Sequence, residues 1–152
     1  STAWTSAGHG GLRPILGDGW SEDEAWGVWG VGSSHEVNLY LTERPDADLQ
    51  VDADVGVALT GPRQSQSVDV FVGDTIMTTW HFLKENNYGV RSLQIPKTAV
   101  TVDDGDGASV RLVFHPHDVT PLNRLDPGNK DTRSLGLALV RLRASEPSEI
   151  AC

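Results

Sequence analysis

The sequence is poor in several features that define whole classes of protein. Of its 152 residues only Cys152 is a cysteine, so the chain cannot form an intrachain disulfide. Lysine and arginine number 12 against 21 aspartates and glutamates, and the net charge of −9 disfavours nucleic acid and anionic membrane surfaces as partners. No apolar run has the length of a membrane span, so membrane insertion is not expected.

A helical period is also missing from every long segment. Apolar and polar residues alternate instead, which is the pattern of half-buried strands. The clearest alternation covers 49–59 and places Asp52 and Asp54 on the outer face of a sheet. Gly73-Asp74 lies between two β-rich runs and is typical of a two-residue hairpin turn. The other segments expected to be extended begin near Trp26 or cover 37–41, 68–72, 75–82, 90–95, 99–102, 110–115 and 134–143.

These alternating segments predict an all-β fold. About seven to nine short strands separated by turn signals are typical of an antiparallel β-sandwich, here expected to be jelly-roll-like. A chain of 152 residues is expected to form a single domain over 1–152. Within it, 1–11 is expected to be a loose lead-in and 145–152 a polar tail.

The segment 19–29 combines large rings and charge more densely than any other part of the chain. It holds Trp20, Trp26 and Trp29, with an acidic run at 22–24 after the first of them. One interpretation is that all three rings belong to the core, since large aromatic side chains are mostly buried. The other is that one or two rings form a platform for a ligand, with the carboxylates beside them as hydrogen-bond acceptors.

Glycines define the backbone of this segment. Gly27, Gly30 and Gly32 argue against a helix, because glycine destabilises a helix interior by about 1 kcal/mol relative to alanine. An extended chain from Trp26 onward would place Trp26 and Trp29 on opposite faces, because they are three residues apart. We therefore expect one ring to enter the core and the other to point elsewhere.

Catalytic chemistry has little support in the sequence. Glu22 and Glu24 are an acid/base pair by residue type, but such a pair must face a glycosidic bond from opposite sides, which neighbours on one loop rarely achieve. Ser21 lacks the following glycine of a nucleophile elbow. The sequence therefore predicts that the domain is not an enzyme.

Two segments have the residue types of metal ligands. His115 and His117 would project to one side of an extended chain, as metal-binding pairs do, or would be two exposed imidazoles at a strand end. Asp103, Asp104 and Asp106 would bind Ca²⁺ or form an ordinary glycine-containing hairpin turn. No metal or other cofactor is expected, with Ca²⁺ kept as the alternative.

Two blocks resemble a known family. Gly-Trp-Ser-Glu-Asp-Glu-Ala-Trp-Gly-Val-Trp at 19–29 resembles the G-W-x-x-x-E-x-W-G-x-W opening of a C-terminal β-sandwich accessory domain of bacterial glycosyltransferases and envelope-glycan proteins. Asp-Thr-Arg-Ser-Leu-Gly-Leu-Ala-Leu at 131–139, preceded by Thr120-Pro121, resembles its D-x-R-x-L-G-[LI]-A-L close. The resemblance implies a bacterial protein of the cytoplasm or periplasm, involved in polysaccharide biosynthesis, with a glycosyltransferase domain of the same polypeptide as a partner.

The matching positions allow two interpretations. They are Trp20, Glu24, Trp26, Trp29, Asp131, Arg133 and Gly136. In a packing role, Trp26 and Trp29 would join the first strand to the last, and Arg133 would form a buried pair with a carboxylate such as Glu24. In a binding role, the same residues would belong to a ligand site.

The resemblance implies a non-catalytic module that binds or positions carbohydrate. Sugar rings stack their C–H faces on aromatic rings, and their hydroxyls need carboxylate, amide or guanidinium partners. The candidate ligand-binding residues are Trp20, Glu24, Trp26, Trp29, Tyr40, Trp80, Tyr88 and Arg133. The alternative is a structural or protein-interaction domain, and a third hypothesis is a glycan hydrolase or esterase that uses Glu24 or a histidine.

Overall fold

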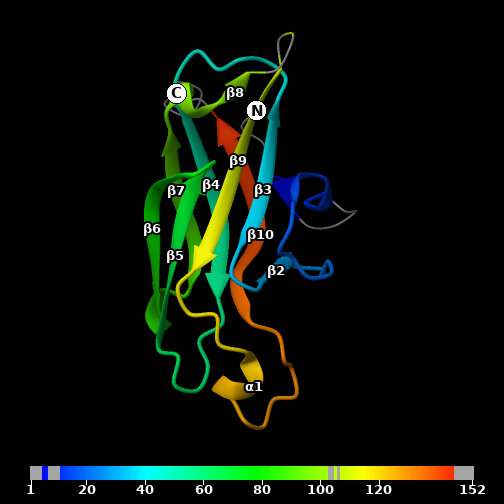
Figure 1. The fold of residues 1–152 in the computed structure, drawn as a ribbon, viewed down its shortest axis with the longest axis vertical. Helices are drawn as coiled ribbons and strands as arrows, with labels where there is room; N and C mark the ends of the chain where they lie inside the picture. The colour runs from blue at the N-terminus through cyan, green and yellow to red at the C-terminus, as the bar shows by residue number, and fades with distance from the viewer. Residues whose placement is uncertain (1–4, 7–10, 103–104, 106, 146–152) are drawn as a thin grey trace.

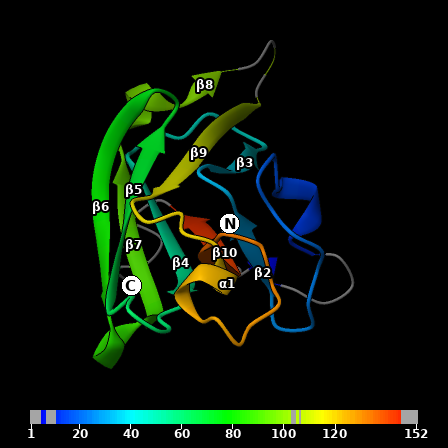
Figure 2. The same ribbon diagram turned by 60° about the horizontal axis from the view of Figure 1, so that its bottom comes forward.

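The structure is a computed structural model that describes residues 5–6, 11–102, 105 and 107–145. It consists mainly of two β-sheets that lie face to face (Figures 1 and 2). Sheet A contains β1 (Thr5–Ser6), β2 (Val28–Val31), β4 (Leu49–Val57), β7 (Tyr88–Ile95) and β10 (Leu135–Ser145). Sheet B contains β3 (His35–Leu41), β5 (Ser65–Val72), β6 (Thr75–Leu83), β8 (Thr101–Val102) and β9 (Ala108–Pro116).

All strand pairs are antiparallel. Sheet A has the order β1-β10-β4-β7, with β2 also paired to β10, and sheet B has the order β3-β9-β5-β6, with β8 also paired to β9. The predicted antiparallel, jelly-roll-like sandwich is therefore confirmed. Short helices occupy some of the connections: the 3₁₀ helices η1 (Arg13–Ile15), η2 (Lys84–Asn86) and η3 (Lys97–Ala99), and α1 (Leu122–Leu125). None of the helices in the described ranges is long and apolar enough to cross a membrane.

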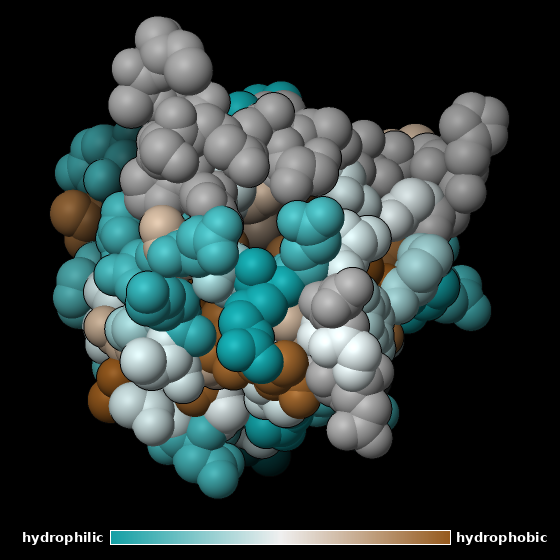
Figure 3. All heavy atoms as spheres, turned by 90° about the horizontal axis from the view of Figure 1, so that it is seen from above, coloured by the Kyte–Doolittle hydropathy of each residue, from teal (hydrophilic) through white to brown (hydrophobic). Residues whose placement is uncertain are grey.

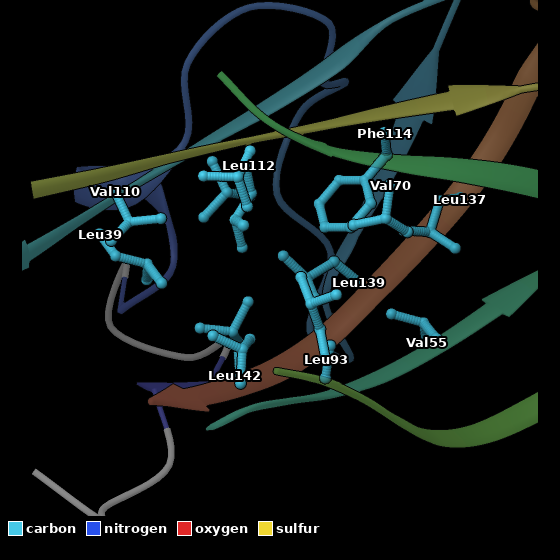
Figure 4. Packing of buried hydrophobic residues seen from close by; sticks show 14 of the residues in the cluster. Leu39, Val55, Val70, Leu93, Val110, Leu112, Phe114, Leu137, Leu139 and Leu142 are labelled. Carbon is cyan, nitrogen blue, oxygen red and sulfur yellow. The ribbon is translucent and has the colours of Figure 1, made fainter. Parts of the chain in front are cut away.

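The core lies between the two sheets and follows the alternation seen in the sequence. On β4, Val51, Ala53, Val55 and Val57 are buried in it, and the residues between them face outward. Figure 4 shows side chains from both sheets meeting in the middle, among them Phe114 and Leu139. Burying these apolar surfaces is the main force that holds the sheets together.

The hairpin prediction is confirmed, whereas two local expectations need correction. Gly73, with φ of +57°, and Asp74 connect β5 to β6. Within the expected loose lead-in, 5–6 forms β1 by adding to the edge of β10. η1 follows this lead-in, and Leu12, the residue before it, is buried. In the expected strand at 99–102, only 101–102 is extended.

A buried histidine connects the two sequence blocks of the resemblance. His35 is fully buried, and its Nε2 accepts a hydrogen bond of 3.3 Å from the Leu137 N–H. Trp20, from the first block, has its ring centroid 5.3 Å from that of His35. A Cβ added to Gly136, in the second block, would collide with the His35 ring, as would one on Gly30. The glycines are therefore needed for close packing against this ring.

The imidazole of His35 is uncharged in the folded protein. Burial lowers the pKa of His35 to about 4, while the nearby backbone of Ser34 and Gly19 acts in the opposite direction. Burial has this effect because it removes the charged form from water. His35 is thus a neutral packing residue whose protonation opposes the folded state.

A buried arginine anchors the long connection between β9 and β10, which carries α1 at the lower end of Figure 1. Arg63 is 3% exposed and donates from its two Nη atoms to four carbonyl oxygens at 3.2–3.3 Å. These carbonyls belong to Ala58, Leu135, Asp118 and Thr120. Arg63 Nε also donates to Asp118 Oδ2 at 3.3 Å. One guanidinium therefore holds three segments of the chain together.

The carboxylate of Asp118 is part of the same structure. Burial alone would raise the pKa of Asp118, but hydrogen bonds from Thr120 and Arg63 overcome this and lower it to about 2. Gln66 supports the turn by donating from Nε2 to the Asp118 carbonyl at 2.9 Å. No signal in the sequence marked Arg63 for this role.

The end of the sandwich opposite α1 is mainly hydrophilic. Figure 3 shows this end from above, and its hydrophobic residues form small, separate groups. Among the described residues visible there, none forms a broad apolar surface of the kind that marks a stable protein interface.

Candidate functional site

The outer face of sheet A carries a row of residues that runs from one edge of the sheet to the other. Core residues alternate with outward residues on each strand, so Gly56 on β4 and Ala138 on β10 face outward. The register places Tyr88 of β7 beside Gly56, and Trp29 of β2 beside Ala138. Together, Tyr88, Gly56, Ala138 and Trp29 are called the aromatic row below.

Small residues shape the middle of the aromatic row. A Cβ added to Gly56 would collide with the Tyr88 ring, so this ring leans inward from the edge strand and lies over β4. Tyr88 is nevertheless 58% exposed. Gly56 and Ala138 are both buried beneath the side chains of this face. Tyr88 is therefore an accessible ring supported from below by a glycine.

Trp26 lies beside Trp29, at the β2 end of the row. Its ring contacts that of Trp29 edge to face, with centroids 5.5 Å apart and planes at 77°, and Trp26 is 41% exposed. The expectation that the two rings take opposite faces is wrong, because Trp26 precedes β2 and the alternation begins only at Val28. Val28, 1% exposed, occupies the core position instead. The two indoles form one aromatic pair, in which Trp26 is exposed and Trp29 is half-buried.

Paired charges lie beside the aromatic row. In the neighbouring row of this face, Arg141 on β10 lies opposite Asp54 on β4, and Arg141 Nε donates to Asp54 Oδ2 at 3.2 Å. In the next row, Asp52 accepts from Ser92 Oγ at 2.6 Å, Gln50 Nε2 at 2.9 Å and Arg143 Nε at 2.9 Å. The outward position predicted for both aspartates is confirmed, and each has an arginine partner across the β4–β10 pair.

These hydrogen bonds fix the charge on Asp52. Burial would raise the pKa of Asp52, but the bonds from Ser92, Gln50 and Arg143 more than compensate and lower it below its ordinary value. The carboxylate is therefore ionised at neutral pH and held in one orientation. An amphipathic surface results, with exposed rings on one side and ordered polar groups on the other.

A shallow hollow next to Trp20 is a separate feature of the surface. Arg13, Trp20, Ser21, Glu22 and Asp23 line an open hollow of about 500 Å³. Arg13 forms an ion pair with Asp23 and donates to the Ser21 carbonyl at 2.6 Å. The Trp20 indole N–H donates to the carbonyl of Glu36 at 2.7 Å. The polar end of Trp20 is thus occupied within the protein, which indicates a packing role.

Two other aromatic candidates lie away from the aromatic row. Trp80 is 6% exposed in the core, with its ring centroid 5.7 Å from that of Phe114, so it is not available to a ligand at the surface. Tyr40 is 69% exposed but lies on β3, in the other sheet. The structure therefore brings together only Tyr88, Trp29 and Trp26 of the predicted rings.

The proposed buried pair between Arg133 and Glu24 is not formed. Arg133 pairs with Asp131 two residues earlier, with Nη2 and Oδ2 2.7 Å apart, and its side chain is 43% exposed. Side-chain and backbone hydrogen bonds from Arg133 lower the pKa of Asp131 to about 2. Glu24 lies in an exposed turn and contributes only a distant electrostatic effect on Arg133. The short loop before β10 favours the local partner.

The predicted metal ligands are not brought together. His115 packs on Phe71, with centroids 4.9 Å apart, whereas His117 Nε2 and Asp69 Oδ1 are 2.8 Å apart. Within the part of the chain that the structure describes, no three His, Cys, Asp or Glu side chains are grouped to hold a metal ion. The acidic turn with Asp103, Asp104 and Asp106 lies outside the described residues.

Comparison with known proteins bears on the fold. No family model matches the chain, and no curated protein matches it. The CBM36-1 domain of a multidomain xylanase from the hindgut metagenome of Trinervitermes trinervoides is 9% identical, with a TM-score of 0.52 over 94% of this chain and 95% of that one. The C-terminal CBM6 of a marine laminarinase from Zobellia galactanivorans is 10% identical, with a TM-score of 0.50 over 96% and 100%.

A larger enzyme contains a similar region. A family GH115 4-O-methyl-α-glucuronidase is 12% identical with a TM-score of 0.53, and the match covers 89% of this chain but 17% of the enzyme. The shared feature is the β-sandwich. At identities this low, the likeness shows the fold alone.

The rings of the candidate site are predictable from the sequence, whereas the small residues beneath them are not. Tyr88, Trp26 and Trp29 were candidates, and Asp52 and Asp54 were placed on the outer face. Gly56 and Ala138 were missed because a small residue inside a strand gives no signal about what lies above it. The pairing of β10 with β4, which joins them, depends on contacts far apart in the chain.

Proposed function

We propose that this protein is a non-catalytic carbohydrate-binding module and that glycan binds on the outer face of sheet A. The observation that carries the proposal is the aromatic row, with the Asp54–Arg141 and Asp52–Arg143 pairs beside it. The likeness of the fold to the CBM36-1 and CBM6 domains supports the same class of function.

The chemistry of this face suits a sugar. The exposed rings of Tyr88 and Trp26 offer flat apolar surfaces for the C–H faces of pyranose rings. Asp54 and Arg141 lie beside them with partly exposed side chains, and they offer an acceptor and donors to hydroxyl groups. Because both groups are already ordered by their mutual ion pair, little conformational entropy is lost when a hydroxyl binds them.

Affinity electrophoresis in gels containing soluble polysaccharides tests the proposal. A panel of xylan, laminarin, hydroxyethyl cellulose and bacterial envelope glycans should contain at least one that retards the wild-type protein. Tyr88→Ala should abolish most of that retardation, whereas Tyr40→Ala, an exposed tyrosine on sheet B, should leave it unchanged. Equal retardation of both variants would place the glycan elsewhere on the molecule.

The same experiment separates the other hypotheses. If no polysaccharide in the panel retards the wild-type protein, the structural or protein-interaction role replaces glycan binding. Release of reducing sugar or acetate from a retained polysaccharide would support the hydrolase or esterase. We expect neither product, because the face offers ordered ion pairs rather than two carboxyl groups on opposite sides of a bond.

We further propose that the module serves a bacterial envelope-glycan protein, in the cytoplasm or periplasm, as an accessory to a glycosyltransferase domain. The support for this context is the pair of blocks at 19–29 and 131–139. The domains found in the complete polypeptide that contains this chain test this proposal. A glycosyltransferase domain in the same polypeptide is the expected result, and a glycoside hydrolase domain there would contradict it.

A further inference from the structure

The geometry points to the class of glycan: an internal stretch of a linear, uncharged polysaccharide that lies across the strands of sheet A. This inference rests on the proposed function. It is carried by three properties of the outer face, namely the separation of its rings, the open ends of the aromatic row and the balance of its charges.

The rings are too far apart to share one sugar. The Tyr88 ring lies over β4, and Trp29 arises from β2, two strand spacings or ~10 Å away. Trp26 lies beside Trp29, with 5.5 Å between the two indole centroids. A pyranose is about as wide as one aromatic ring, so one sugar can stack on one platform only. A ligand that uses the whole row must therefore contain several linked sugars.

Both ends of the row are open. β7 is an edge strand of sheet A, and on the far side of β2 lies, among the described residues, only the short segment 19–21, which pairs with it. Tyr88 at the β7 end and Trp26, beside Trp29 at the β2 end, are 58% and 41% exposed. A polysaccharide chain can thus enter at one edge and leave at the other. Recognition should not depend on a reducing or non-reducing end.

The charges of the face cancel. Asp54 pairs with Arg141 and Asp52 pairs with Arg143, so each guanidinium on this face already has a carboxylate partner. The whole chain carries a net charge of −9, which repels an anionic polymer over a distance of about one Debye length, ~8–10 Å. A neutral glycan meets no such penalty, and its hydroxyls can still bond to the paired groups.

Isothermal titration calorimetry tests the length requirement. The probes are xylo-, cello- and laminari-oligosaccharides of increasing length, each also in a form with its reducing end converted to an alditol. Within the series that binds, affinity should rise at least about fivefold when the ligand becomes long enough to reach a second ring, and then level off. The alditol of a long oligosaccharide should bind as well as its parent.

A pair of glycine variants tests the route of the chain. Gly56→Ala places a methyl group where the Tyr88 ring now lies and must displace that ring. It should remove the gain with length, so that a long oligosaccharide binds no more tightly than a short one. Gly128→Ala is the matched control, because its nearest neighbour would be Asp126 Oδ1 at 3.6 Å, an ordinary contact. Thermal melting curves of both variants establish that they are folded.

The outcomes separate this inference from the proposed function. A short sugar that binds as tightly as a long one, or a loss of binding in the alditol, overturns the internal-chain inference but leaves a carbohydrate-binding module. Polygalacturonate that binds more tightly than every neutral glycan at low salt overturns the preference for an uncharged chain. If no neutral or anionic glycan binds the wild-type protein, both the inference and the proposed function fail.

Discussion

Replacing Arg63 by alanine should destabilise the sandwich far more than removing a surface arginine. The change deletes the donors to four carbonyl groups and the partner of Asp118 at once. Since Arg63 is 3% exposed, water cannot readily replace these donors while the fold is intact. The segments around Ala58, Thr120 and Leu135 would lose their common anchor.

The magnitude follows from the hydrogen bonds. At 3.2–3.3 Å they are longer than average, so about 0.5–1 kcal/mol each is appropriate, and the four carbonyls together account for about 2–4 kcal/mol. The unpaired carboxylate adds little, because the Asp118 side chain is 39% exposed and water screens its charge. Arg63→Lys should recover part of this loss, since an ammonium keeps the charge but lacks the planar fork.

Urea unfolding followed by tryptophan fluorescence measures the loss. Arg133→Ala is the control, because its guanidinium is 43% exposed and pairs with Asp131 alone, so its removal should cost less than about 1 kcal/mol. The midpoint of unfolding should fall strongly for Arg63→Ala at an unchanged slope. Equal losses of unfolding free energy in the Arg63 and Arg133 variants would refute this account of the β9–β10 connection.

Two further predictions concern the buried histidine. The pKa of His35 is about 4 in the folded protein and 6.5 in the unfolded chain, so the unfolded chain binds the proton more readily. The stability contributed by the neutral ring is therefore complete above about pH 6.5, and it falls by about 3 kcal/mol as the pH drops to about 4. Unfolding free energies of wild type and His35→Leu measured at pH 7 and pH 4.5 should show the steeper decline in wild type, and parallel declines would contradict the assignment. Gly136→Ala should lower the unfolding free energy by about 1–3 kcal/mol, because the new methyl group would collide with the His35 ring, and a neutral effect in thermal or urea unfolding would show that the ring is free to move.

Much of the fold was predictable because alternation is a local signal. The run at 49–59 has one apolar face, and β4 forms there with Val51, Val55 and Val57 in the core. By contrast, β1 has two residues and exists only because β10 offers an edge. A strand of that kind has no signature in its own sequence.

The candidate site was predictable only in its parts. Tyr88 and Trp29 are 59 positions apart in the chain, and they share a face because β7, β4, β10 and β2 pair in that order. Trp80 has the same chemistry as the other tryptophans but is 6% exposed, since it lies at an inward position of β6. Arg133 pairs with a carboxylate only two residues away, and residue type alone does not distinguish this local partner from a distant one. Residue type identified the candidates, and strand pairing selected among them.

Backbone chemical-shift perturbation by nuclear magnetic resonance tests the central claim most directly. The isotope-labelled protein would be titrated with the oligosaccharide that binds best in the polysaccharide and length series. The account predicts that the largest shifts fall on Tyr88, Gly56, Ala138 and the Trp29 indole, with Tyr40 unaffected. Shifts confined to the hollow around Trp20, or to the outer face of sheet B, would contradict it.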